Sequence, residues 1–526
     1  MVSSDDRDVP LRRAELLASL SLAADLGMGQ PLESAQRTAI VTVALGRAAG
    51  LAARELKDAY YVAFLRYVGC TADAPIAAAV FGGDEIAARG WLAQCDWGKQ
   101  ADVMRVLMRN IGAGKSALQR ARLYAGLFVK MPRLTGTTES HCEVAQALAD
   151  DLGCSVRVRE ALGYAFERWD GKGAPRKKKG EAIPLAMRVA QVADDAQAFH
   201  RSGGVEGAAA MLAARAGRAL CPTLAETARA GAAEILAALD VASVWDAAIA
   251  AEPGAPDYVD EAAIDGALQA MGAFADLKSS YTRGHSTGVA ELAAGAAQRL
   301  GLGAEVVADV RRAGYVHDVG RAGVSAGVWE KEGPLTDGEW EKVRQHAHYT
   351  ERILARPPLL ARLGALGSLD HERMDGTGYQ RLAAGSLPPG ARVLAAADMY
   401  QAMRETRPHR RSIAREEVAA TLEGEAAKGR LDREAVRAVL ETAGDRVARG
   451  RGRGSPGDCP GGLSDEEIEV LRLVSRGLTN KQVAAKLEIS VRLVGQFLAH
   501  AYEKIGVTTR AGAAMFAMKN GIVGAV

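Results

Sequence analysis

The chain is poor in the features that build sheets and membrane spans. Aromatic residues make up 5% of its 526 residues. Extended runs of Val, Ile and Tyr are nearly absent, whereas Ala-rich runs such as GAAAMLAARAGRAL favour helices. No stretch of 18 apolar residues occurs, and the opening MVSSDDRDVPLRR has no apolar signal segment. The sequence therefore predicts an all-α, soluble, cytoplasmic protein without a membrane partner.

Cysteine usage excludes further classes of small domain, whereas net charge excludes none. Six cysteines are scattered along the chain and none forms a CxxC pair, so neither a zinc knuckle nor a disulfide framework is indicated. Scattered thiols are typical of a reducing cytoplasm. The formal net charge of +2 does not decide between nucleic-acid and small-molecule partners.

Two parts of the chain repeat one another. LGYAFERWDGKGAP around Asp170 resembles LGSLDHERMDGTGYQ around Asp375, and FLRYVGC aligns with YVHDVGR. His141 precedes Asp170 by 29 residues, and His346 precedes Asp375 by the same number. Because one spacing is kept across separate motifs, the sequence indicates an internal duplication.

The second copy carries His and Asp residues in the order H…HD…H…DH…D. Asp318 is predicted to bridge two divalent cations. Imidazole and carboxylate ligands together favour Fe or Mn, with Mg as the alternative, over a closed structural zinc site. Such a pair of cations activates water and neutralises phosphate, which is the chemistry of phosphoester hydrolysis. The predicted ligands are His285, His317, Asp318 and Asp398 for one cation, and His346, Asp370, His371 and the shared Asp318 for the other.

The first copy has lost most of these groups. Only His141 and Asp194 remain at ligand positions, and one imidazole with one carboxylate cannot hold a dinuclear centre. We therefore predict a folded, metal-free pseudo-domain, and favour a packing role over ligand sensing. The residues at the other ligand positions are Ser34, Arg66, Tyr67, Ala165 and Phe166.

These motifs resemble the HD superfamily of phosphohydrolases and, within it, the HD-GYP cyclic dinucleotide phosphodiesterases. The resemblance covers about residues 280–410 and includes LTDGEW, HERMDGTGY and RPHR. It implies a helical bundle around a dinuclear Fe or Mn site, with the seven residues above as ligands. It also implies catalytic roles for Asp318 and for Arg321, which stands where the family usually has lysine.

Two further departures from the family leave two functions open. Asp370 replaces the first of two adjacent histidines, and Gln380 ends the motif that is usually Gly-Tyr-Pro. One hypothesis is a metal-dependent phosphohydrolase acting on a cyclic nucleotide. The other is a transcription factor whose HD unit binds metal and a phosphate-bearing ligand without hydrolysing it. An intact dinuclear site favours the enzyme.

The C-terminal residues 463–526 have the pattern of a helix-turn-helix unit. Ser464 with Glu467, and Thr479 with Gln482, form capping boxes, and Ser490 is predicted to cap the following helix. That helix is predicted to bury Val491, Val494, Ala501 and Ile505 and to expose Arg492, Gln496 and His500.

This unit resembles the LuxR-type DNA-binding domain through GLTNKQVAAKLEIS and YEKIGVTTRAGA. The resemblance implies four helices, duplex DNA as partner, and homodimerisation through the last helix. The residues expected near DNA are Asn480, Lys481, Ser490, Arg492, Gln496 and Lys504.

The order of these parts resembles that of HD domain-containing LuxR-family transcriptional regulators. We predict tandem HD-type helical bundles followed by the four-helix DNA-binding domain. The expected boundaries are 1–255 for the degenerate copy, 256–444 for the metal-binding copy, 445–462 for a flexible basic Gly/Pro linker and 463–526 for the tail.

Overall fold

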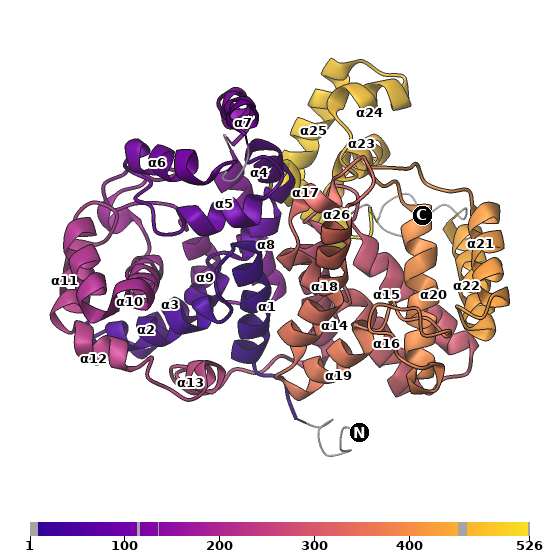
Figure 1. Ribbon diagram of the computed structural model, residues 1–526, viewed down its shortest axis with the longest axis horizontal. Helices are drawn as coiled ribbons and strands as arrows, with labels where there is room; N and C mark the ends of the chain where they lie inside the picture. The colour runs from indigo at the N-terminus through magenta and orange to yellow at the C-terminus, as the bar shows by residue number, and fades with distance from the viewer. Residues whose placement is uncertain (1–8, 113–115, 135, 451–459, 524–526) are drawn as a thin grey trace. The chain divides into compact units, whose positions relative to one another are not determined.

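The regular secondary structure of this protein is helical. The computed structural model describes residues 9–112, 116–134, 136–450 and 460–523, and in these ranges it contains α-helices, 3₁₀ turns and three isolated β-bridges but no strand (Figure 1). The predicted all-α class is therefore confirmed. None of the helices in these ranges combines the length and the apolar character needed to cross a bilayer.

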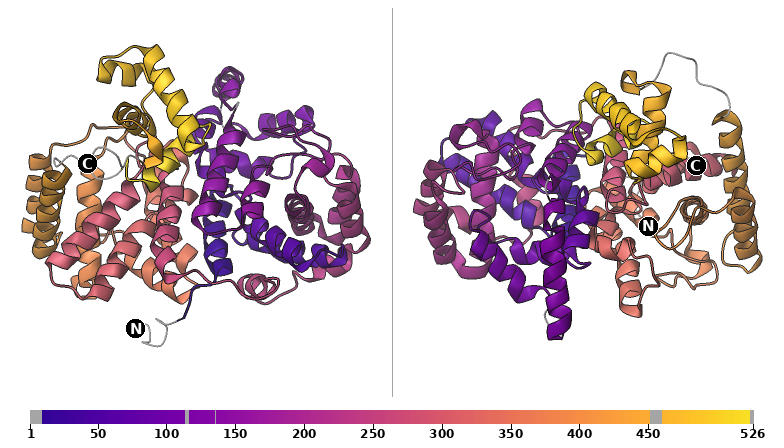
Figure 2. Two further views of the ribbon diagram at one scale, coloured as in Figure 1. Left: turned by 180° about the vertical axis from the view of Figure 1, so that it is seen from behind. Right: turned by 90° about the horizontal axis from the view of Figure 1, so that it is seen from above.

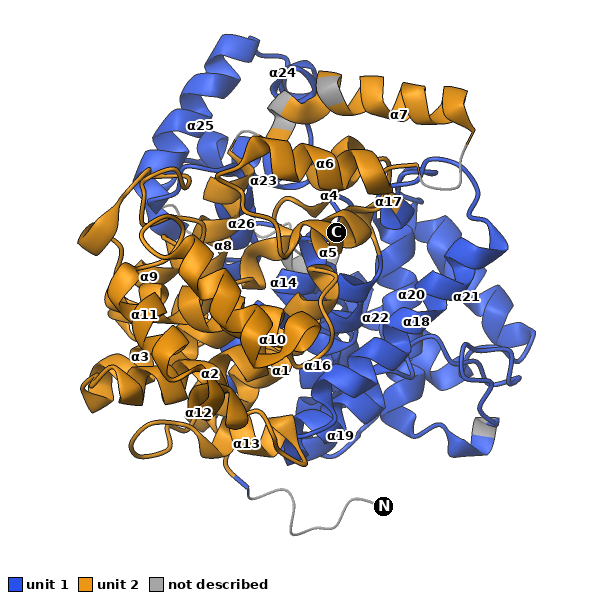
Figure 3. Ribbon diagram, turned by 60° about the vertical axis from the view of Figure 1, so that its left-hand side comes forward, with its two compact units in different colours: residues 1–9, 264–324, 328–526 blue, residues 10–263, 325–327 orange. Residues whose placement is uncertain are grey.

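The chain divides into two compact units, coloured separately in Figure 3. In chain order, the first unit takes residues 10–263 and 325–327 and is orange in Figure 3, where the key calls it unit 2. The second unit takes residues 264–324 and 328–526 and is blue, as unit 1 of the key. The division falls a few residues after the boundary that we predicted between residues 255 and 256.

Within its described residues, the first unit contains thirteen α-helices, and these pack mainly around α2 and α10. The helices are α1 (Arg13–Gly27), α2 (Ser34–Ala48), α3 (Ala53–Leu65), α4 (Ala74–Val80), α5 (Glu85–Leu92), α6 (Gln100–Asn110), α7 (Ala117–Lys130), α8 (Thr137–Asp151), α9 (Val156–Leu162), α10 (Leu185–Arg215), α11 (Pro222–Ala230), α12 (Ala232–Ala237) and α13 (Val244–Ala250).

The second unit packs around α15, which contacts α16, α20 and α22. Its helices before the tail, together with α17, which straddles the division, are α14 (Glu261–Asp276), α15 (His285–Arg299), α16 (Ala304–Val316), α17 (Ala326–Trp329), α18 (Asp337–Leu354), α19 (Pro358–Gly367), α20 (Pro389–Arg404), α21 (Arg415–Ala427) and α22 (Arg433–Gly450).

The duplication is visible in the helix bounds. Helices α2 and α3 begin and end 251 residues before α15 and α16, and α10 begins 204 residues before α20. A tight contact is also repeated. A Cβ at Gly69 would lie 2.1 Å from the carbonyl oxygen of His141, and a Cβ at Gly320 would lie 2.0 Å from that of His346. In both copies, therefore, a residue without a side chain lets a 3₁₀ turn approach the helix that carries the histidine.

The segment between α3 and α8 is longer than its counterpart between α16 and α18, and it contains α4, α5, α6 and α7. These helices have a small core of their own, which includes Leu92, Leu107 and Leu127. The insertion therefore adds a packed layer to the first copy and leaves the repeated helices unchanged.

The C-terminal segment forms four helices, which are drawn in yellow in Figure 2. Two clusters of buried side chains hold these helices together, one around Leu471 and Ala513 and the other around Val483 and Val494. The helices are α23 (Asp465–Ser475), α24 (Asn480–Leu487), α25 (Val491–Ile505) and α26 (Arg510–Lys519).

The predicted helix caps of the tail are confirmed, but one position predicted to be buried is exposed. Both predicted capping boxes form, and the Ser490 hydroxyl accepts the Leu493 backbone N–H at 3.1 Å. Val491, predicted to be buried, is 50% exposed. It is the first residue of α25 and is in line with Val494, Leu498 and Ala501 by helical spacing, so its exposure follows from its place at the end of the helix, ahead of the buried series.

Part of the predicted linker is helical. Helix α22 extends to Gly450, so residues 445–450 continue a helix and do not begin a flexible segment. Residues 451–459 lie outside the described residues, and for them the linker stays a prediction.

The repeated glycine contact predicts a stability effect. Gly69→Ala should lower the free energy of unfolding by about 1–3 kcal/mol, because the added methyl overpacks the turn against the His141 carbonyl. Denaturant titration followed by circular dichroism measures this. The control is Gly126→Ala, since Gly126 lies within α7 and a Cβ there meets nothing within 4 Å. Equal effects of the two substitutions would contradict the packing argument.

Candidate metal centre

Five chain segments bring the predicted ligands to one place in the second unit. His285 is the first residue of α15, after Gly284 with a φ of 82°. His317 and Asp318 follow α16 at the start of a 3₁₀ turn, His346 lies within α18, and Asp398 lies within α20. The remaining two ligands, Asp370 and His371, follow α19.

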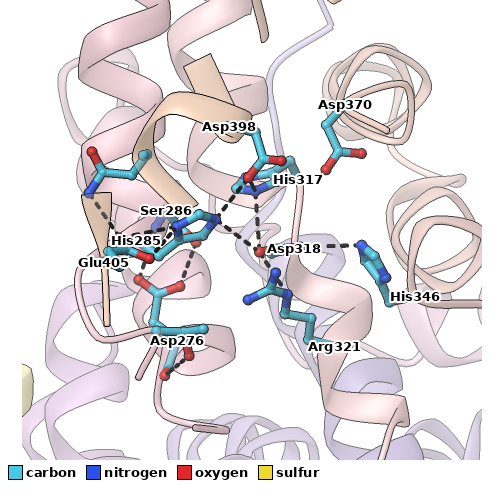
Figure 4. A network of polar contacts seen from close by, with 12 residues as sticks. Asp276, His285, Ser286, His317, Asp318, Arg321, His346, Asp370, Asp398 and Glu405 are labelled. Atoms are coloured by element: carbon cyan, nitrogen blue, oxygen red, sulfur yellow. Dashed lines mark hydrogen bonds and ion pairs between the residues drawn. The ribbon is translucent and has the colours of Figure 1, made fainter. Parts of the chain in front are cut away.

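Asp318 lies at the centre of the cluster (Figure 4). One of its carboxylate oxygens is 3.5 Å from His285 Nε2 and 3.2 Å from His317 Nε2, and the other is 3.4 Å from His346 Nε2. The side chains of Asp318, His285 and His317 have no solvent exposure. One carboxylate therefore faces three imidazole nitrogens, as a bridging ligand would.

The other predicted ligands complete two further groups. His346, Asp370 and His371 place one ligand atom each within 4.8 Å of one another, and so do His317, Asp370 and Asp398. Asp398 also reaches His285, with 3.1 Å between Oδ1 and Nε2. All seven predicted ligands thus lie in one contiguous cluster.

The donor set fits a metal, because several of its buried polar atoms make ionic contacts but no hydrogen bond. Six buried side-chain atoms make no hydrogen bond: Nε2 of His317, Nε2 of His346 and both carboxylate oxygens of Asp318 and Asp370. Buried polar groups are normally satisfied, and leaving one unsatisfied costs about 1–3 kcal/mol. Cations between these atoms would satisfy all six with the hard oxygen and imidazole ligands that divalent metals take.

Outer hydrogen bonds fix the histidine rings. Nδ1 of His317 is 2.8 Å from the Gly314 carbonyl oxygen, and Nδ1 of His346 is 2.5 Å from that of Val343. Each contact leaves Nε2 facing the cluster, as in metal sites whose second imidazole nitrogen donates outward.

Two positioning residues were missed in the sequence. Glu405 holds His285 Nδ1 at 3.0 Å, and the Thr350 hydroxyl donates to the His317 carbonyl at 2.7 Å and accepts the Gly320 N–H at 3.0 Å. Glu405 follows α20 directly, within RETRPHR, so its place beside a matched motif was the available signal.

The pKa values of the two central carboxyl groups are shifted in opposite directions. Burial opposes ionisation of both, but Arg321 and His317 hold the pKa of Asp318 well below its usual range. Burial raises the pKa of Asp370 well above its usual range, and the charges of Asp398 and Asp318 add to this effect. A cation between them would favour ionisation of both, since a nearby positive charge stabilises a carboxylate.

Arg321 provides a fixed positive charge beside the ligands. Its Nε lies 2.8 Å from Asp318 Oδ2, and its guanidinium lies 4.8 Å from the centre of the Trp329 ring. The residue is only 8% exposed, and its Nη1 is buried without a hydrogen-bond partner. The stacked, ion-paired guanidinium thus keeps N–H groups available for an anionic ligand.

The first copy fills the corresponding place with its own side chains. Asp194 accepts hydrogen bonds from Arg66 at 2.7 Å and from Tyr67 at 2.8 Å. Phe166 packs on His141 with ring centres 4.7 Å apart, much as His371 packs on His346 at 5.0 Å. A guanidinium therefore neutralises the carboxylate, and among the described residues of this copy no three metal-ligating side chains converge.

The tail exposes part of its predicted DNA-contacting set. Lys481, Arg492 and Gln496 have exposed side chains. Asn480 accepts a hydrogen bond from Arg510 at 2.5 Å, and Lys504 pairs with Glu467 at 2.7 Å. Asn480 and Lys504 are thus already engaged within the domain, and Ser490 is used as the helix cap.

Comparison with known proteins identifies both kinds of domain. The HD domain family matches residues 131–222 and 269–435, and the luxR family of bacterial regulatory proteins matches residues 462–517. HD-family sequence therefore occurs in both copies.

Similar proteins include phosphodiesterases. A 3'3'-cGAMP-specific phosphodiesterase of Vibrio cholerae is 28% identical over 415 residues, which are 78% of this chain and 90% of the relative. A cyclic di-GMP phosphodiesterase of Thermotoga maritima is 31% identical over 146 residues, which are 27% of this chain and 40% of the relative. The crystal structure of a V. cholerae cyclic GMP-AMP specific phosphodiesterase covers 83% of this chain and 98% of its own, with 25% identity and a TM-score of 0.55.

The ligand cluster predicts where metal binds. The 526-residue protein reconstituted with Mn²⁺ should retain metal after desalting, and Asp318→Ala should lose most of it, because this carboxylate contacts His285 through one oxygen and His346 through the other. His141→Ala in the first copy should leave the metal content unchanged. Inductively coupled plasma analysis measures the stoichiometry. An equal loss in both variants would mean that the second copy is not the metal-binding one.

Proposed function

We propose that this chain, an HD-domain protein with a C-terminal LuxR-family regulatory domain, is a DNA-binding transcriptional regulator that hydrolyses a cyclic nucleotide. The observation that carries the proposal is the convergence of unsatisfied imidazole and carboxylate atoms around Asp318. The similarity to cyclic dinucleotide phosphodiesterases, which extends over most of the chain, supports the choice of substrate class.

The cluster would hold two divalent cations, with Fe or Mn preferred over Mg. His285, His317, Asp398 and Asp318 would bind one cation. The other would be bound by His346, Asp370, His371 and the shared Asp318. Bound there, the metal pair would supply Lewis-acid polarisation of a phosphate and acidification of a water.

Arg321 is proposed to orient the substrate phosphate. Its guanidinium is held by Asp318 and by the Trp329 ring, so it loses little freedom when it binds an anion. Its unpartnered Nη1 supplies a donor to a phosphate oxygen, where negative charge accumulates in the transition state. Glu405 is proposed to act through His285: its carboxylate contacts Nδ1 of that ring and so keeps Nε2 directed at the other ligands.

The second candidate is a receptor that binds the nucleotide without cleaving it. Two departures from the family favour it: an aspartate at position 370, and a glutamine at the end of the Gly-Tyr motif. In the structure the Gln380 amide donates to the Ser368 carbonyl at 3.2 Å, and the Gln380 backbone N–H donates to Glu372 at 2.6 Å. That loop is thus held by internal bonds, whichever function applies.

The tail is proposed to bind duplex DNA as a homodimer, through the exposed face of α25 and with α26 at the dimer contact. Arg492 and Gln496 are the exposed polar side chains of the first turns of α25, the part of a recognition helix that meets base edges. The order of domains, with a degenerate copy, a metal-binding copy and a DNA-binding tail from residue 463, belongs to the same proposal.

Hydrolysis is tested with cyclic dinucleotides and the metal-loaded protein. Arg321→Ala should reduce kcat by about 10²–10³-fold, the loss typical of removing one donor to a developing negative charge. Arg321→Lys should retain most of the activity, because it keeps a cation beside Asp318. The products are separated by chromatography. A wild-type protein that binds Fe or Mn but cleaves no cyclic nucleotide would favour the receptor.

DNA binding is tested by electrophoretic mobility shift at two salt concentrations against a library of genomic fragments. Arg492→Ala should weaken specific binding by about 1–3 kcal/mol if this side chain contacts a base. Lys481→Ala should weaken binding to all sequences alike, since a phosphate contact carries no sequence information. If the wild-type protein retains no fragment even at low salt, the proposal that the tail binds DNA is wrong.

A further inference from the structure

One loop of the first unit gathers positive charge on its surface. Between α9 and α10 the chain reads GKGAPRKKKG over residues 171–180. Residues 168–181 contain six cations and two carboxylates, so the segment is strongly positive. Like charges held this close repel one another, and a bound anion relieves the repulsion. Five of the cations are exposed, and we call them the basic loop: Lys172, Arg176, Lys177, Lys178 and Lys179.

The carboxylates that precede the basic loop do not neutralise it. Glu167 is 2% exposed, and its two oxygens accept the backbone N–H groups of Arg176 at 2.6 Å and of Lys178 at 2.9 Å. Asp170 pairs with Arg168 at 3.0 Å. In the part of the chain that the structure describes, the side chains of residues 176–179 form no ion pair with a carboxylate. These four charges therefore face solvent.

Backbone hydrogen bonds hold the basic loop in one shape. Besides the two N–H groups bound by Glu167, the N–H of Gly180 donates to the Trp169 carbonyl oxygen at 3.0 Å. The N–H of Asp170 donates to the Arg218 carbonyl oxygen at 2.8 Å, which brings an exposed cation from another segment beside the loop. Because the backbone is already ordered, little conformational entropy is lost when an anion binds here.

The second copy shows that the shape of the loop does not require these cations. Its equivalent loop has the same clamp, in which Glu372 accepts the N–H groups of Gln380 and Leu382. The left-handed residue is repeated too, since Lys177 has a φ of 52° and Arg381 a φ of 57°. At the four positions that hold RKKK in the first copy, the second copy holds QRLA. The same backbone forms with one cation in place of four, so the charge serves something other than folding.

The form of the basic loop selects the anion. A row of lysine and arginine side chains matches the row of phosphates along a nucleic-acid backbone. Residues 170–180 contain no aromatic side chain on which an unpaired base would stack, so a duplex fits better than a single strand. The chain also carries a luxR-family domain at residues 462–517, and duplex DNA is the polyanion that such a domain meets.

We propose that the basic loop is a second DNA-contacting surface of this protein, which binds the phosphates of duplex DNA without reading its sequence. The inference rests on the proposed DNA binding by the tail, and it adds a contact outside the tail. Phosphate contacts carry no sequence information. The loop thus adds affinity and salt dependence, while the choice of sequence stays with α25.

The test measures how binding to duplex DNA depends on salt. The 526-residue protein and a variant with Lys177→Gln, Lys178→Gln and Lys179→Gln are titrated against a fluorescently labelled random-sequence duplex at several salt concentrations. The slope of log K against log salt should become shallower by about 0.9 for each phosphate contact that is lost, and binding should weaken severalfold. The three side chains are exposed, so circular dichroism should show an unchanged fold.

A matched control removes the same charge elsewhere in the first unit. Arg47→Gln, Arg54→Gln and Arg109→Gln take three exposed cations from α2, α3 and α6. This control variant has the same net charge as the lysine variant and should keep the wild-type slope. If both variants lower the slope equally, overall charge and not the basic loop is responsible, and the inference is wrong.

The basic loop and the tail are distinguished by comparing their variants. A lysine variant with the wild-type slope, together with a Lys481→Ala variant that binds weakly, would refute the loop and leave the tail standing. A weakened lysine variant, with no effect of Lys481→Ala or Arg492→Ala, would do the reverse. A wild-type protein that binds no duplex at low salt would refute both. Binding of phosphatidylglycerol vesicles through the three lysines, with an unchanged DNA slope, would also overturn the inference.

Discussion

A fully buried carboxylate, Asp318, is the constraint on which the second unit depends. An ionised carboxylate away from water is stable only beside compensating charge. Three imidazoles and the Arg321 guanidinium surround it, and they come from α15, the end of α16, α18 and the adjoining 3₁₀ turn. The bundle is therefore organised around charge compensation as much as around apolar packing.

The first copy shows the same frame with a different compensation. Asp194 keeps the position of Asp398, but its partners are the Arg66 guanidinium and the Tyr67 hydroxyl. The 3₁₀ turn still approaches the histidine helix through a glycine. The loop after the lost ligands is still clamped in the same way: Glu167 accepts the N–H groups of residues 176 and 178, as Glu372 accepts those of residues 380 and 382. The two copies thus share their backbone geometry although the first has lost the ligand set, because a side chain can take the place of a cation without moving a helix.

The ligand set and the tail were predictable for different reasons. Ligand spacing and the duplicated motifs identified all seven clustered residues, since each segment carries its own recognisable pattern. The caps of α23, α24 and α25 were predictable because capping is local in the sequence. Val491 was assigned wrongly because its exposure depends on where α25 meets its neighbours, and periodicity gives that only within a residue or two.

The sequence by itself determined the helical class, the duplication, the identity of the candidate ligands and the helix-turn-helix tail, because these depend on composition, spacing and short-range hydrogen bonds. Only the tertiary structure decided that Glu405 orients His285, that Trp329 holds Arg321, and that the Tyr379 ring packs on His371. Those contacts join residues from separate segments, and their partners are set by the packing of helices, which no local pattern encodes.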